Sequence, residues 1–354
     1  MMNKIGKIEY KEIKRISPSQ FYSIKSCAYK SILAEAFEKK PLLPVSPNAY
    51  LGTVLHKILE LISIKEIKTD FELETRFDAE INSLEKRLLQ EGNGFITPLQ
   101  KSVKDYGIKK IQLKKHLSNL PRKIVESKAI AEKWFESKDG LIGGKIDLIL
   151  EIGQDIEIID FKTGAITQDT LNENGEISTE IKDEYLEQLK LYAYLFYECT
   201  SRFPTRLSLV DLAKQKISIE FSLEECKAAF DDAKKVLAET NKSISTGFYN
   251  ANVNEKNCIY CLYRPACSFY LKNLSLNNVY NDVSGFIKNV VQYSNGNITV
   301  LLDNGCHSVT VTGFTNTNPE YFISKRNRLI NIFNLRKGIL SNVYSATKTT
   351  TIYE

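Results

Sequence analysis

The sequence predicts an α/β protein in which a mixed sheet flanked by helices is followed by a small all-β barrel. Three observations favour this fold class. The chain has 354 residues, of which 43% are apolar, so about two domains with apolar cores are expected. Helical patterning prevails as far as residue 137 and gives way to strand patterning from residue 141. Beyond about residue 276, short strand patterns recur between turn signals.

Helices are expected first. Ser17-Pro18-Ser19-Gln20 combines an N-cap with a proline at the first helical position, and it opens a helix over residues 17–40. A break with three prolines separates it from a helix over 49–63. Residues 66–137 are interpreted mostly as polar amphipathic helix, interrupted by glycines and by Pro121.

Strands follow. Residues 141–152 and 156–162 are rich in β-branched residues, and Gly153-Gln154-Asp155 between them indicates a hairpin. Residues 183–199 and 223–242 are predicted to be helices, and residues 207–221 to hold two more strands. These elements form the mixed sheet and its flanking helices.

The C-terminal region, residues 276–354, is predicted to be a separate domain from residues 1–275. It carries more than half of the excess positive charge of the chain. Five short strands with a polar insert suit a small Greek-key barrel. The expected strands are Asn278–Val291, Ile298–Leu302, His307–Phe314, Leu329–Leu335 and Val343–Tyr353.

Composition narrows the setting of the protein. No stretch approaches the roughly 18 uninterrupted apolar residues that cross a bilayer, so no membrane partner is expected. The polar N-terminus lacks the apolar core of a secretory signal, which predicts a cytoplasmic protein. The net charge of +5 is a weak hint of an anionic partner.

Two predicted neighbouring strands carry carboxylates. Asp160 and Lys162 are two residues apart, so their side chains project from one face at the end of an apolar strand, and Asp147 lies on the partner strand. Such carboxylates can hold one hard divalent cation, while the lysine steadies a water nucleophile or a phosphate oxygen. The alternative is a surface ion pair, although the end of an apolar strand is a costly place for one.

Two polar residues stand out on predicted helices. His56 falls just beyond the edge of an apolar stripe, and Gly52 one turn earlier is expected to clear space beside the imidazole. His56 alone fits a boundary residue better than a ligand. Gln188 shares an apolar face with Tyr185 and Tyr192, so it needs a buried partner or a substrate group.

Three cysteines crowd into the segment Cys258-x2-Cys261-x5-Cys267. In a reducing compartment this spacing favours a metal site over disulfides. Zinc and an iron–sulfur cluster each want a fourth ligand. Cys27 is the natural candidate, and Cys199, Cys226 and Cys306 are the alternatives.

Together, these residues resemble a known family. Gly52-x3-His56, Gly144-Lys145-Ile146-Asp147, Asp160-Phe161-Lys162 and Gln188-x3-Tyr192, bracketed by the cysteines, are similar to RecB-like nucleases of the PD-(D/E)XK superfamily. The narrower likeness is to their iron–sulfur branch of CRISPR-associated exonucleases and AddB-like proteins. It runs from about residue 15 to about residue 272 and implies a restriction-endonuclease-like sheet.

The resemblance also implies roles. His56, Asp147, Asp160 and the Phe161 carbonyl would bind Mg²⁺ or Mn²⁺. Lys162 would orient the attacking water, and Gln188 would act in catalysis and line the DNA path with Tyr185 and Tyr192. Cys27, Cys258, Cys261 and Cys267 would hold a [4Fe–4S] cluster, with Zn²⁺ as the alternative.

The C-terminal pattern resembles an OB-fold, a barrel that often binds single-stranded nucleic acid. The candidate DNA-binding residues there are Arg326, Arg328, Arg336 and Lys337. The candidate stacking aromatics are Phe286, Tyr293, Phe314, Tyr321, Phe322 and Phe333. Most aromatics in a small barrel belong to its core.

The expected function is that of a metal-dependent DNA nuclease, an exonuclease on single-stranded ends in repair, recombination or phage defence. No G-x4-G-K-[ST] phosphate loop occurs, so any unwinding needs a separate helicase or recombination protein. One alternative is a non-catalytic nucleic-acid-binding partner of such a complex. Another is a zinc-stabilised structural protein.

Overall fold

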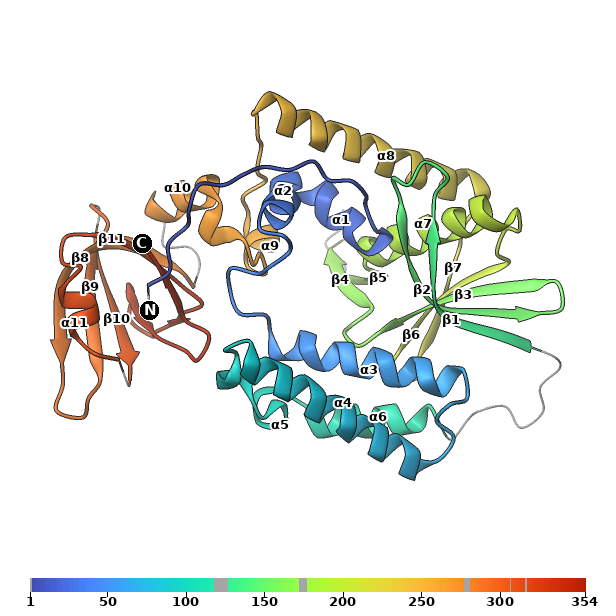
Figure 1. Cartoon of the computed structure of the whole chain (residues 1–354), viewed down its shortest axis with the longest axis horizontal. Coiled ribbons are helices and arrows are strands. Elements are labelled where there is room, and N and C mark those ends of the chain that lie inside the picture. Colours follow the sequence, from blue (N-terminus) through green and yellow to red (C-terminus); the bar gives the residue numbers. More distant parts are fainter. Residues whose placement is uncertain (1, 118–126, 172–176, 277–280, 306, 316) are drawn as a thin grey trace. The chain divides into compact units, whose positions relative to one another are not determined.

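The computed structural model describes residues 2–117, 127–171, 177–276, 281–305, 307–315 and 317–354 (Figure 1). The chain forms two compact units. Unit 1 combines residues 1–12, 26–45 and 246–354, and unit 2 combines residues 13–25 and 46–245. The division into domains 1–275 and 276–354 stays a prediction, and the cysteine segment shares unit 1 with the C-terminal strands.

Unit 2 contains a five-stranded sheet in the order β1-β2-β3-β6-β7. β3 and β6 run parallel and the other neighbours run antiparallel, so the sheet is mixed as expected. The strands are β1 (Ser127–Glu136), β2 (Gly143–Ile152), β3 (Asp155–Lys162), β6 (Arg206–Asp211) and β7 (Lys216–Ile219). The hairpin of β4 (Thr167–Leu171) and β5 (Ile177–Ile181) forms a separate two-stranded sheet.

Helices cover both faces of this sheet (Figure 1). One apolar cluster joins it to α7 (Asp183–Thr200) and α8 (Leu223–Thr246), and a second joins it to α3 (Pro47–Ser63) and α4 (Asp70–Gln90). β3 is buried along nearly its whole length because it is covered on both sides. The other helical elements of unit 2 are α1 (Pro18–Ser26), η1 (Gly94–Ile96), α5 (Leu99–Ser102) and α6 (Tyr106–Lys115).

Local sequence explains where several elements begin. The Ser46 hydroxyl accepts a hydrogen bond from the Asn48 N–H at the start of α3, and Thr69 and Glu72 form a capping box on α4. The expected β2–β3 hairpin is confirmed, with Ile152 opposite Asp155 and Gly153 at φ +61°.

Two expectations for the N-terminal half are wrong. The single helix over 17–40 is two helices, α1 and α2 (Ala28–Ala36), because Cys27 between them has an extended backbone. Helical structure in the described part of 66–137 stops at Lys115, and residues 127–136 form β1. β1 is an edge strand rich in charged residues. The spacing of its apolar residues did not distinguish such a strand from a polar helix. Pro121 lies outside the described residues.

In unit 1, seven strands in the order β12-β13-β10-β9-β8-β11-β14 curl into a half-barrel around an apolar core (Figure 1). They are β8 (Val283–Gln292), β9 (Ile298–Asp303), β10 (Ser308–Phe314), β11 (Leu329–Phe333), β12 (Arg336–Lys337), β13 (Val343–Ser345) and β14 (Thr351–Tyr353). Only β10 and β13 pair in parallel in this described sheet. The helical elements are α2, α9 (Glu255–Cys258), η2 (Arg264–Ala266), α10 (Ser268–Leu276) and α11 (Glu320–Ile323).

The first four expected C-terminal strands correspond to β8 to β11, although residues 278–280 lie outside the described part. The fifth, 343–353, is two strands, since the chain turns at Thr347, where the Thr350 N–H donates to the Thr347 carbonyl. Among the described residues, no helix is both long and apolar enough to cross a lipid bilayer.

Candidate active site

β2 and β3 place two aspartates side by side. The strands pair as far as Leu148 opposite Ile159, and Asp147 and Asp160 come next on each strand. Asp147 Oδ2 accepts a hydrogen bond of 2.9 Å from the Phe161 N–H. The Asp147 side chain is therefore tied to the end of β3.

Asp160 lies at the centre of a closed polar arrangement and is only 3% exposed. Gln188 Nε2, from α7, donates to Asp160 Oδ1 at 2.7 Å, and Lys162 Nζ donates to Gln188 Oε1 at 2.9 Å. Lys162 Nζ also lies 2.6 Å from Asp160 Oδ2. That contact lacks hydrogen-bond geometry, so Oδ2 is buried with no hydrogen bond from any described residue.

α3 brings His56 to the same place. Its Nδ1 lies 3.6 Å from Asp147 Oδ2. The prediction that Gly52 clears space beside the His56 imidazole is wrong. A Cβ at Gly52 would instead lie 3.2 Å from Thr163 Oγ1. Gly52 thus lets α3 approach the segment after β3, and the nearest group it makes room for is Thr163 rather than the imidazole.

The electrostatics of the site follow from its burial. Burial raises the pKa of Asp160 to about 6, against the effect of the Lys162 charge and with added repulsion from Asp147. Burial lowers the pKa of His56, but the close approach of Asp147 and the charges of Asp147 and Asp160 outweigh this, so that the pKa stands above its usual value. Perturbed groups of this kind gather at functional sites.

Two tyrosines of α7 flank the carboxylates. Lys162 Nζ lies 4.3 Å from the centre of the Tyr185 ring, a cation–π contact. Tyr192 is buried, and a Cβ at Gly144 would lie 3.2 Å from its Cε1 and its hydroxyl. The structure thus brings together His56, Asp147, Asp160, Lys162, Gln188 and both tyrosines, and their roles stay predictions.

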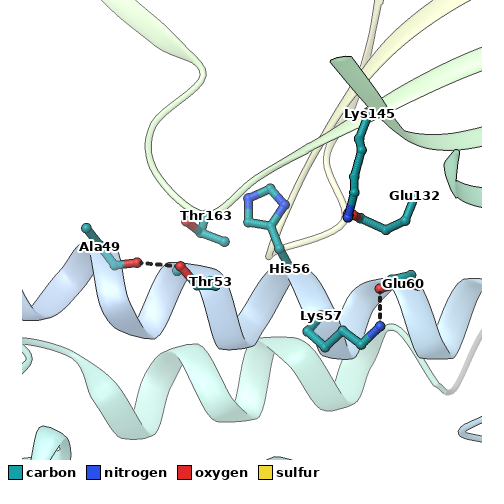
Figure 2. A pocket seen from close by; sticks show the side chains of 9 residues that line it. Ala49, Thr53, His56, Lys57, Glu60, Glu132, Lys145 and Thr163 are labelled. Atoms are coloured by element: carbon teal, nitrogen blue, oxygen red, sulfur yellow. Dashed lines mark hydrogen bonds and ion pairs between the residues drawn. The ribbon is translucent and has the colours of Figure 1, made fainter. Parts of the chain in front are cut away.

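An open pocket of about 690 Å³ adjoins His56. It is lined by Ala49, Gly52, Thr53, His56, Lys57, Glu60, Glu132, Lys145 and Thr163. Figure 2 shows the Lys145 and Glu132 side chains meeting beside His56, above α3. Lys145 Nζ donates to Glu132 Oε2 at 3.0 Å, and Lys57 Nζ to Glu60 Oε2 at 2.7 Å. The sequence reasoning assigned no role to these four charged residues.

The comparisons with known proteins agree with this arrangement. The profile of the PD-(D/E)XK nuclease superfamily matches residues 15–268. The chain belongs to the PD-(D/E)XK nuclease superfamily. The match contains the β2–β3 carboxylates, His56 and Gln188, and it ends just after Cys267.

Solved structures resemble this PD-(D/E)XK chain only distantly. A "Putative exonuclease" from Eubacterium rectale is 11% identical with a TM-score of 0.44, over 73% of this chain and 88% of the other. The crystal structure of SSO0001 is 15% identical with a TM-score of 0.30, over 73% and 89%. None of the curated proteins compared with the chain matches it.

The side chains of the site include the donor types that bind a divalent cation, although they are not arranged around a common point. Among the described residues, no three His, Cys, Asp or Glu side chains are grouped so that they could hold a metal ion. Asp147 is directed at the Phe161 N–H and Asp160 at Gln188. However, an imidazole and two carboxylates, one of them with a buried oxygen that accepts no hydrogen bond from the described residues, are donor types that Mg²⁺ or Mn²⁺ accepts.

The four predicted cluster ligands all lie in unit 1. Cys258, Cys261 and Cys267 are buried and Cys27 is half-buried, all as free thiols. Burial raises the pKa of Cys258, and the charges of Cys261 and Cys27 raise it further. Among the described residues, no three of these cysteines are grouped so that they could hold a metal ion. Of the alternatives, Cys199 and Cys226 belong to unit 2, and Cys306 lies outside the described residues.

A buried ion pair joins the cysteine segment to the half-barrel. Arg264 is 5% exposed and its Nε donates to Asp282 Oδ2 at 2.6 Å. Its Nη1 donates to the Cys261 carbonyl and its Nη2 to Asn334 Oδ1. Tyr270 adds a hydrogen bond to Asp282. Arg264, which lies between Cys261 and Cys267, is thus tied to Asp282 next to β8 and to Asn334 next to β11.

The half-barrel presents the four predicted basic residues to solvent, since Arg326, Arg328, Arg336 and Lys337 are all exposed. Of the candidate stacking aromatics, Phe286 and Tyr293 are about half exposed. Phe314, Phe322 and Phe333 are buried, so the expectation that they could stack on bases is wrong. They supply the apolar contacts that a small barrel needs.

Proposed function

We propose that this PD-(D/E)XK chain is a metal-dependent DNA exonuclease that hydrolyses phosphodiester bonds from single-stranded ends. The observation that supports it most is the closed arrangement of Asp160, Lys162 and Gln188 beside Asp147 and His56. It joins a buried carboxylate to a fixed ammonium at the edge of an open pocket. Phosphoryl transfer needs such fixed charge of both signs.

His56, Asp147, Asp160 and the Phe161 carbonyl would hold Mg²⁺ or Mn²⁺. When bound, the ion would polarise the phosphate and lower the pKa of a water nucleophile. Lys162 neutralises negative charge that develops on the phosphate oxygens. Gln188 fixes that ammonium and Asp160 with one amide, so neither side chain needs to reorganise during the reaction.

The cysteines are proposed to hold a [4Fe–4S] cluster, with Zn²⁺ as the alternative. Four thiols in one unit, three of them buried, support a tetrathiolate site. Protein purified without oxygen should then be brown, with broad absorption near roughly 400 nm and about four iron atoms per chain. A colourless preparation with stoichiometric zinc would identify the alternative.

DNA is the proposed substrate, and the half-barrel is proposed to grip it. A meander of β8, β9 and β10, with β13 parallel to β10 and β11 beside β8, supports the OB-like description. Arg326, Arg328, Arg336 and Lys337 would contact phosphates. A separate helicase or recombination protein, in repair, recombination or phage defence, would supply unwound strands.

The test is cleavage of labelled single-stranded DNA with Mg²⁺ or Mn²⁺, on linear and on circular substrates. Linear DNA should shorten and circles should persist. Asp160→Asn and Lys162→Gln should each lower the rate by at least about 100-fold. The control is Asp155→Asn, an exposed carboxylate at the other end of β3, which should keep the wild-type rate.

The alternative is a non-catalytic partner that binds nucleic acid. DNA binding by the wild type without cleavage of any DNA form, with either metal, would favour it. Cleavage of circles as fast as of linear strands would instead make the enzyme an endonuclease.

A further inference from the structure

The only tryptophan of the chain, Trp134, stands on the edge strand β1 with 48% of its surface exposed. The Arg15 guanidinium lies 5.0 Å from the centre of its ring, and the indole Nε1 donates to Glu136 Oε2 at 3.1 Å. Arg15 also forms an ion pair with Glu136. The ring is therefore held at one face and at its edge while much of it remains open to solvent.

Neighbouring residues leave room for this ring. A Cβ at Gly143 would lie 3.0 Å from Trp134 Cζ2 and 2.9 Å from Arg15 Cδ. A side chain at Gly143 would thus displace the stacked Arg15 and Trp134. The position of the exposed indole is therefore fixed by Arg15, Glu136 and the space at Gly143.

Trp134 lies directly opposite Lys145 in the β1–β2 register. The Lys145 side chain is 57% exposed and lines the pocket with His56 (Figure 2). Lys145 precedes Asp147 by two residues, roughly 7 Å along the strand. The Trp134 ring on β1, the Lys145 ammonium opposite it on β2 and the Asp147 carboxylate two residues further along β2 thus follow one another.

This order matches the chemistry of one nucleotide. Aromatic rings stack on the faces of bases, and lysines contact the phosphates between them. In a duplex each base is stacked on both sides, so only an unpaired base offers a face to a side chain. The Glu132 partner of Lys145 is no barrier, because an exposed ion pair exchanges partners at little cost.

We propose that Trp134 and Lys145 form a subsite for one unpaired nucleotide, with its base on the indole and its phosphate at the ammonium. The inference rests on the proposed nuclease function and specifies its substrate as a single strand at the active site. The shared chemistry also admits a released mononucleotide, which the experiment separates from the strand.

The single tryptophan provides the measurement. Wild-type protein in EDTA, where no metal supports cleavage, is titrated with oligo(dT), with a blunt duplex and with dTMP, and indole emission is followed. Oligo(dT) should quench the emission at saturation, and the duplex should leave it unchanged. Quenching by dTMP at comparable concentrations would identify a product site instead of a strand site and would overturn the proposal. Oligo(dT) that binds by fluorescence anisotropy without quenching would also overturn it.

Variants give a second readout through anisotropy of labelled oligo(dT). Trp134→Leu should weaken binding by roughly 5- to 150-fold with an unchanged salt dependence, and Trp134→Phe should restore much of it. Lys145→Gln should reduce the slope of log affinity against log salt by about 0.7. The matched control is Lys133→Gln, the same charge change on β1, where Lys133 lies over the Phe135 ring.

Circular dichroism and melting curves confirm that each variant is folded. If Trp134→Leu and Lys145→Gln both bind oligo(dT) like the wild type, the subsite is wrong. The proposed function fails separately: quenching by oligo(dT) without cleavage in Mg²⁺ or Mn²⁺ would leave a single-strand binder. Cleavage without any effect of Trp134 would leave a nuclease whose strand runs elsewhere.

Discussion

Asp160 is a buried carboxylate that is costly for stability and that we propose as a metal ligand. A buried carboxylate is destabilising unless it is neutral or fully paired, and here only one of its oxygens accepts a hydrogen bond from the described residues. Burial therefore raises the pKa of Asp160 from 3.8 to about 6. If Asp160 is a metal ligand, as proposed, a bound cation would replace this proton.

The raised pKa predicts a pH dependence of stability. The folded state binds a proton on Asp160 more tightly than the unfolded state does, so this stabilisation is complete below about pH 4 and is lost as the pH rises through about 6. The free energy of unfolding in EDTA should fall across that window by up to about 3 kcal/mol. Urea titrations at several pH values measure it.

Asp160→Asn should flatten this part of the profile, and the exposed Asp155→Asn should not. His56, whose pKa is also raised, contributes stability that is lost at higher pH, as the pH rises through its folded pKa. An equal slope in wild type and Asp160→Asn between pH 4 and 6 would contradict the assignment to Asp160.

Tyr185 is predicted to position Lys162 rather than to stack on a base, since its ring faces the ammonium at 4.3 Å. Tyr185→Phe keeps the ring and should keep kcat. Tyr185→Leu should lower kcat by roughly 2- to 30-fold with little change in KM. Single-turnover rates check this, and equal effects of Phe and Leu would contradict it.

Site residues could be predicted from the sequence where the spacing within a single strand or helix indicates them. Asp160 and Lys162 are found from a two-residue period, and Gln188 from the face of one helix. Trp134 and Glu132 were missed because their meaning depends on the register between β1 and β2, and residues 127–136 were interpreted as helix. The hairpin signal at 153–155 could be seen from sequence, whereas the partner on the other side of β2 could not.

At the scale of elements, close packing between α7 and β2 sets the shape of the site. Gly144 faces α1 and α7, where a Cβ would lie 2.9 Å from Pro18 Cδ and 3.2 Å from the Tyr192 ring. Glu132, which faces the Asp147 position across the register, has φ of +50° and interrupts the β1–β2 ladder. The irregular residue of β1 therefore lies opposite the predicted metal ligand Asp147.

Gly144→Ala is predicted to lower the free energy of unfolding by about 1–3 kcal/mol, since the added methyl group overpacks this contact. The control is Gly164→Ala, where a Cβ would meet nothing within 4 Å. Urea unfolding followed by Trp134 emission measures both. A Gly144→Ala protein as stable as the control would show that α1 or α7 shifts to accommodate the methyl group at little cost in stability.

Within unit 1, the Arg264–Asp282 pair connects regions far apart in sequence. Arg264→Met leaves Asp282 charged and buried, and it should cost about 3–5 kcal/mol of local stability. Arg264→Met combined with Asp282→Leu should cost less, because no buried charge remains unpaired. The readout is hydrogen exchange in peptides from β8 and β11, the strands that border Asp282 and Asn334.

The control is Arg87→Met, which breaks an exposed pair with Glu91 at 3.8 Å and should leave exchange in β8 and β11 unchanged. Protection of β8 and β11 that survives Arg264→Met would mean that the half-barrel does not depend on the cysteine segment. The sequence could not have indicated this pair, since an arginine between cysteines carries no sign of its distant partner.

The discontinuity of unit 1 has a consequence for synthesis on the ribosome. Residues 46–245, which make most of unit 2, emerge as one continuous stretch. Residues 1–12 of unit 1 instead wait for strands that are synthesised after unit 2, since Asn3 hydrogen-bonds to Ile352 and Glu354. Nascent chains should therefore acquire protease resistance in two steps, with the sheet of unit 2 folding first and the half-barrel of unit 1 folding later.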